Sequence, residues 1–169
     1  ISVNDDSSQK LPLTVGYFKD LCSRFMSEKS AKLAEKLTLE PPVEPVSTGS
    51  VFLDEWYAKE RCLRLALAQI RALKMKKDIK DLPSASDGES VQAARTATGM
   101  DSPLAAEQYL NQYRLGILDR IAPMDSFSAD AVYSYGLKLM LAERMKKFNK
   151  DEGLASYHKI YDEILGEKK

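Results

Sequence analysis

Two glutamates and three arginines are the residues whose types and spacing come closest to a chemical site. Glu60 and Glu107 each lie on or beside the apolar stripe of an expected helix, so each carboxylate should be partly buried. A buried carboxylate needs a cationic partner. Arg64 follows Glu60 by four residues, Arg114 follows Glu107 by seven, and Arg144 lies near another apolar face. The pattern favours a Glu–Arg network that fixes helix register, although ordinary surface ion pairs explain it equally well.

This cluster is also the only candidate for an enzyme site, which would require a carboxylate with a strongly raised pKa in a cleft. A di-metal carboxylate bundle would need a histidine three residues after each glutamate, but Leu63 and Leu110 stand at those positions. His158 is the single histidine and has no metal-ligand spacing around it. No nucleophile elbow and no glycine-rich phosphate loop occurs. We therefore predict no catalytic, cofactor-binding or metal-binding residue.

A second group of residues suits contact with another protein. Aromatic side chains with a polar tip are enriched at interfaces, and neighbours on a helix point to different faces, so some should reach the surface. Core packing explains most of the aromatics equally well. A basic cluster at the end of the longest helix would suit an acidic partner or lipid headgroups, or simply a solvated helix end. The candidate interface residues are Trp56, Tyr57, Tyr109, Tyr113, Arg71, Lys74, Lys76 and Lys77.

The elements that must position these residues are all helical. Residues 51–77 contain neither Gly nor Pro and predict a helix roughly 40 Å long. Shorter helices are expected after caps at Thr14 and Ser27, over 89–98, from Ser102 to about 121, and from Ser128 to about 148. Strand signals are nearly absent. The predicted fold is all-α, with six or seven helices around one long central helix and at most a vestigial strand near the N-terminus.

Two details of this prediction concern burial. Phe127 and Val132 fit a hydrophobic staple around the Ser128 cap. The final helix should end at Gly166. The residues expected to be buried on this helix are Leu154, Tyr157, Tyr161, Ile164 and Leu165.

Length and composition point to one folded domain. The chain has 169 residues, 44% of them apolar and 30% charged. We expect a helical domain over 11–165, with a Pro-rich connector at 40–49 and a flexible loop at 78–88, between tails at 1–10 and 166–169. Equal numbers of basic and acidic residues, 25 each, argue against nucleic acid as the main partner. Cys22 and Cys62 should be free thiols in a reducing compartment, and no apolar run is long enough to span a membrane.

Four segments resemble a bacterial family of unknown function. They read LPLTVGYFKDLC, FLDEWYAKERCLRLALAQIRALK, SPLAAEQYLNQYRLGILDRI and FSADAVYSYGLKLMLAERM. The genes of that family lie among those for V-type ATPase subunits, at the position expected for the d subunit of the central stalk. The motifs of the resemblance are helical rather than catalytic, and the chain is shorter than a complete d subunit. The three-domain funnel of that subunit is therefore not implied.

The resemblance implies a non-enzymatic accessory or central-stalk-like subunit without a cofactor. Such a subunit would couple the soluble shaft to the membrane rotor through contacts with other ATPase subunits. It would lie in the cytoplasm at the inner face of the cell membrane, attached through its partners and not inserted. A free-standing helical adaptor or regulator of another cytoplasmic protein is the alternative.

Overall fold

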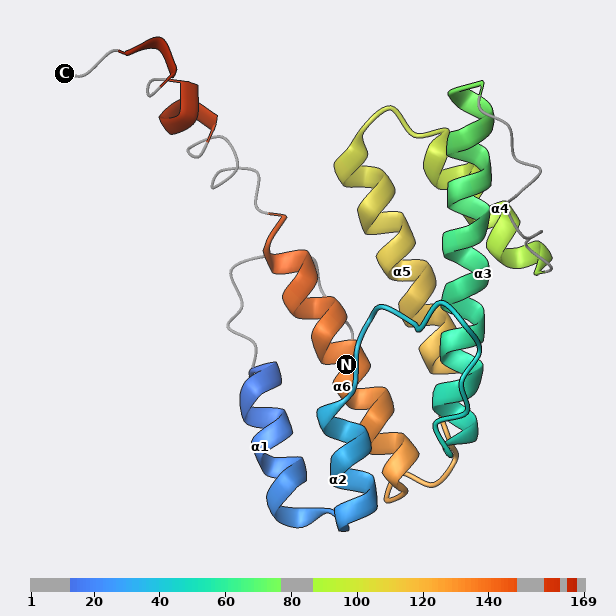
Figure 1. Cartoon of the computed structure of the whole chain (residues 1–169), viewed down its shortest axis with the longest axis vertical. Helices are drawn as coiled ribbons and strands as arrows, with labels where there is room; N and C mark the ends of the chain where they lie inside the picture. The colour runs from blue at the N-terminus through green and yellow to red at the C-terminus, as the bar shows by residue number, and fades with distance from the viewer. Residues whose placement is uncertain (1–12, 77–86, 149–156, 162–163, 167–169) are drawn as a thin grey trace.

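The chain folds into a bundle of helices without a sheet (Figure 1). The computed structural model describes residues 13–76, 87–148, 157–161 and 164–166, and these ranges contain no strand. The helices of the bundle are α1 (Val15–Phe25), α2 (Glu28–Glu35), α3 (Val51–Lys74), α4 (Gly88–Thr98), α5 (Pro103–Ile121) and α6 (Ala129–Lys146). The prediction of an all-α fold is confirmed.

Most helix starts follow from local cap chemistry. Thr14, Ser27, Ser50, Ser102 and Ser128 each accept a hydrogen bond from the backbone N–H three residues ahead, as their positions predicted. Asp87 caps α4 in the same way. The sequence places the start of α4 one residue late because its periodic pattern begins only beyond Gly88.

The core consists of two apolar clusters along the length of α3. One lies between α1, α2, α6, the first half of α3 and the second half of α5, and includes Phe18, Trp56 and Leu137. The other lies between the second half of α3, α4 and the first half of α5, and includes Leu63 and Leu110. Because α3 and α5 contribute to both clusters, these two helices join the halves of the molecule.

The long helix ends earlier than predicted. Helix α3 stops at Lys74, and Lys76 adopts a positive φ of 53°, a left-handed conformation that ends a helix. The expected end at Lys77 falls outside the described residues. Among the described helices, none is both long and apolar enough to cross a bilayer.

Two burial predictions are wrong. Residues 157–161 are helical, but Tyr157, Tyr161, Ile164 and Leu165 are all largely exposed, and Leu154 lies outside the described residues. An apolar stripe marks a face that can be buried without naming its partner, and α1–α6 already close both clusters among themselves. The staple at the start of α6 also does not form, because Phe127 is 97% exposed.

Candidate functional site

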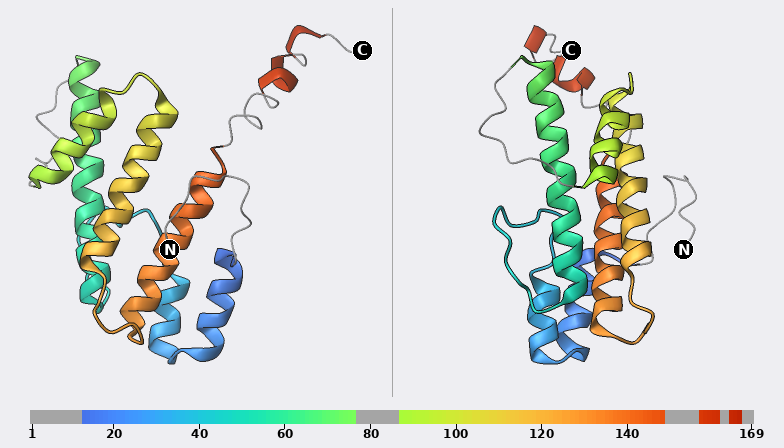
Figure 2. Two further views of the ribbon diagram at one scale, coloured as in Figure 1. Left: turned by 180° about the vertical axis from the view of Figure 1, so that it is seen from behind. Right: turned by 90° about the vertical axis from the view of Figure 1, so that its right-hand side faces the viewer.

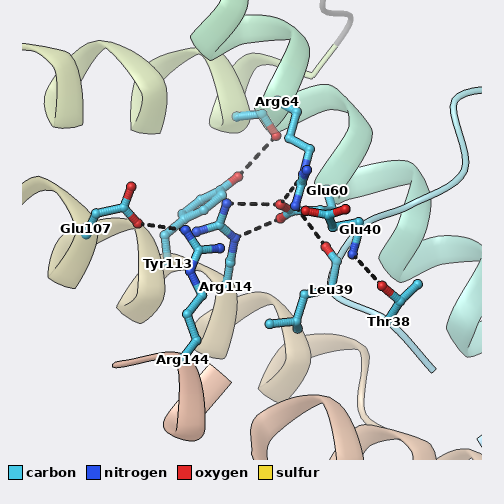
Figure 3. Close-up of polar contacts among 10 residues, drawn as sticks. Thr38, Leu39, Glu40, Glu60, Arg64, Glu107, Tyr113, Arg114 and Arg144 are labelled. Atoms are coloured by element: carbon cyan, nitrogen blue, oxygen red, sulfur yellow. Dashed lines mark hydrogen bonds and ion pairs between the residues drawn. The ribbon is translucent and has the colours of Figure 1, made fainter. Parts of the chain in front are cut away.

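The strongest polar site is an ion triad centred on Glu60 (Figure 3). Nε of Arg114 donates to Oε2 of Glu60 at 2.9 Å, and its Nη2 donates to Oε1 at 2.9 Å. This is the paired geometry in which a guanidinium binds a carboxylate most strongly. Nε of Arg64 adds a third bond to Oε1, also at 2.9 Å. The side chain of Glu60 is only 1% exposed, so this charge is held almost entirely by the two arginines.

The triad lies at the seam between the two apolar clusters. Along α3, Glu60 separates Tyr57 of the first cluster from Leu63 of the second. Along α5, Arg114 separates Leu110 of the second cluster from Ile117 of the first. A one-residue slip of either helix would leave a buried charge without its partner, which costs several kcal/mol. The triad therefore fixes the register of α3 against α5.

Arg64 carries the triad outward to the chain that follows α2. Its Nη2 donates to the backbone carbonyl of Leu39 at 3.0 Å. The side chain of Arg64 is 38% exposed, against 6% for Arg114. Arg64 thus ties the connector to α3 while one side of its guanidinium stays open to solvent.

The second predicted glutamate has a different partner from the one its sequence spacing suggested. Nη2 of Arg144 donates to Oε2 of Glu107 at 3.0 Å, joining α6 to α5, and about a third of each side chain is exposed. Arg114, seven residues after Glu107, bonds Glu60 instead. Seven residues along one helix are separated by about 10 Å, whereas packing of α3 on α5 brings Glu60 into contact.

The arginines line an open groove of about 550 Å³. Helices α3, α5 and α6 form its walls, and Leu39, Glu40 and Val15 close one side. Its cations are Arg64, Arg71, Arg114, Arg144 and Lys147, and its carboxylates are Glu40, Glu107 and Glu143. The structure thus brings all five residues of the predicted Glu–Arg network to one region, with Glu60 behind the groove wall.

A further polar network joins α3, α4 and α5. Lys59 donates to Asp87 at 3.2 Å, Ser90 donates to the other oxygen of Asp87, and the Tyr113 hydroxyl lies 3.3 Å from that of Ser90. The Ser90 hydrogen bond and the Lys59 contact, against the opposing effect of burial, hold the pKa of Asp87 below its usual value. Sequence analysis missed this network, although an Asp before a Gly and a helical pattern is a cap signal.

The candidate interface residues divide into three groups. Trp56 and Tyr57 are buried in the first cluster, so the prediction that they reach the surface is wrong. These large rings fill the space between helices because α3 is covered on several sides. Tyr109 and Tyr113 are half-buried. The basic residues Arg71, Lys74 and Lys76 are exposed, and Lys77 lies outside the described residues.

Other chemistry has little support in the described part of the chain. No group of three or more His, Cys, Asp or Glu residues is placed there to hold a metal ion. Cys22 and Cys62 are free thiols, and burial raises the pKa of Cys22. Comparisons of the chain with protein-family models, with curated proteins and with solved structures found no match.

Proposed function

We propose that this chain is a non-catalytic helical docking subunit, and that its partners are subunits of a bacterial V-type ATPase. In this role it would act as an accessory or central-stalk-like subunit at the cytoplasmic face of the membrane, between the soluble shaft and the rotor. The choice of a V-type ATPase comes from the resemblance of the four helical segments. The docking role is supported by the surface of the bundle.

The observation that carries the docking role is a set of apolar side chains at one end of the bundle, called here the apolar end. It consists of Phe25, Val51, Met124 and Phe127, which are 76%, 82%, 103% and 97% exposed. Exposed apolar side chains that gather on one surface are typical of interaction sites.

Contacts between helix ends place these residues together. Ser50, before α3, donates to Asp130 at the start of α6 at 2.7 Å. The Tyr133 hydroxyl donates to the carbonyl of Ser30 in α2 at 3.1 Å. The α1–α2 turn, the start of α3 and the α5–α6 connection therefore lie at one end, as both views of Figure 2 show.

The bundle is also cross-linked in a way that suits force transmission. Ion pairs join α3 to α5 through Glu60 and Arg114, and α5 to α6 through Glu107 and Arg144. A third pair joins α4 to α5, between Glu89 and Arg120. Helices fixed in register move as one body, which a subunit between a rotating shaft and a ring would need.

The test is an affinity purification of the tagged chain from gently solubilised native membranes, with partners identified by mass spectrometry. Recovery of ATPase shaft and ring subunits in a stable ratio is the expected result. Stoichiometric recovery of a different, soluble partner would replace the ATPase role with that of a free-standing adaptor. Recovery of no partner would contradict both.

A further inference from the structure

We infer that the groove between α3, α5 and α6 is a binding site for the phosphate group of a small molecule or lipid. Its volume of about 550 Å³ lies within the range of about 300–1,000 Å³ usual for small-molecule sites. This inference concerns a surface separate from the apolar end and does not depend on the identity of the ATPase.

The first support is the charge of the groove. Five cations line it, against three lining carboxylates and Glu60 behind the wall. Two of the lining carboxylates are already engaged, Glu107 by Arg144 and Glu143 by the backbone N–H of Val15 at 2.7 Å. Arg71 and Lys147 have no ion-pair partner among the described residues. The groove therefore holds cationic donors that its own carboxylates do not satisfy.

The second support is that two of the arginines are positioned in advance. Glu60 fixes the guanidinium of Arg114 through two bonds and that of Arg64 through one. Within the described part of the chain, Nη1 of each arginine has no hydrogen-bond partner, and neither atom is fully buried without one. A ligand would thus meet donors whose ordering cost is already met by folding, which favours binding.

The type of anion follows from the donors. Guanidinium groups match the oxygens of phosphate and carboxylate, and one arginine is enough for a single carboxylate. Here four arginines and a lysine converge from three helices. A phosphate dianion presents more acceptor oxygens and more charge than a carboxylate, so it can use donors from several helices at once.

The experiment compares two double variants of equal charge change. Arg71→Gln with Lys147→Gln removes the two unpaired cations of the groove. Arg95→Gln with Lys29→Gln removes two exposed cations, on α4 and α2, that do not line the groove. All four side chains are exposed, so both variants should fold, and circular dichroism checks this. Binding of pyrophosphate is measured by calorimetry at low salt, and binding to phosphatidate vesicles by sedimentation.

The expected result is saturable binding to at least one probe, weakened about tenfold or more by the groove variant and little by the control. Loss of one charge-assisted hydrogen bond accounts for a change of this size. Binding to pyrophosphate would identify a soluble ligand, and binding to vesicles alone would identify a lipid headgroup. No saturable binding to either probe, or equal weakening in both variants, would overturn the inference.

Discussion

Glu60 is the residue on which the arrangement of charges in this protein depends. Its position on the apolar stripe of α3 predicted burial, and Arg64 at the next turn was a foreseeable partner. Its closest partner, Arg114, is 54 residues away in sequence and could not be assigned before α5 was placed against α3. The sequence thus identifies a buried charge that needs compensation, while the fold decides which cation supplies it.

Replacing Glu60 by Gln should destabilise the protein by roughly 3–5 kcal/mol, because it leaves the buried guanidinium of Arg114 without a counter-charge. The free energy of unfolding measured in urea tests this. Glu55→Gln is the matched control, since Glu55 lies on the same helix but is exposed, and a change within about 0.5 kcal/mol is expected. Equal effects of the two substitutions would show that the triad does not contribute to stability.

At the scale of helices, packing depends on positions that sequence patterns do not mark. Caps and apolar stripes located the starts of α1, α2, α3, α5 and α6, because these signals act within one turn of helix. The same signals did not show that Trp56 and Tyr57 are covered or that the last apolar stripe is exposed. Burial depends on neighbouring helices, so it follows from the assembled bundle and not from periodicity.

Gly136 shows how closely α1 and α6 approach. A Cβ atom there would lie 2.6 Å from Cε1 of Phe18, so Gly136→Ala should displace α1 and cost roughly 1–3 kcal/mol. Gly116→Ala is the control, because a Cβ on this exposed α5 residue meets nothing within 4 Å. That change should stabilise the fold by about 0.5–1 kcal/mol. Thermal unfolding of both variants measures the difference, and a stabilising effect at both positions would contradict the packing of Phe18 on Gly136.

The attachment of α4 to α3 should depend on pH through Asp87. The hydrogen bond from Ser90 and the ion pair with Lys59 outweigh burial and lower its pKa in the folded state. A lowered pKa adds stability above the unfolded value of about 3.9, and this stability is lost as the pH falls through the folded value. Asp87→Asn keeps a cap acceptor but removes the charge.

This variant should therefore be less stable than the wild-type protein by roughly 0.5–1 kcal/mol at neutral pH, the scale of a partly exposed ion pair. The difference should shrink below about pH 4 and vanish below the folded pKa of Asp87. Urea unfolding at a series of pH values tests this. A difference that stays constant down to acid pH would mean that the charge of Asp87 is not involved.

At the scale of the whole molecule, two apolar clusters joined at a charged seam leave two different surfaces for binding. The apolar end gathers Phe25, Val51, Met124 and Phe127, and the groove gathers the cations of α3, α5 and α6. All-α architecture was predictable from composition and helix signals alone. Neither surface was, because each combines residues from helices that are distant in sequence.

The central claim is that the chain acts by docking onto a partner protein through its apolar end. The most direct measurement is quantitative affinity purification from native membranes with the wild-type chain and with Met124→Ser combined with Phe127→Ser. Both side chains are fully or almost fully exposed, so the fold should persist in the variant. We expect a stoichiometric partner with the wild-type chain and its loss with the variant. Equal recovery with both chains, or no stoichiometric partner with either, would contradict the claim.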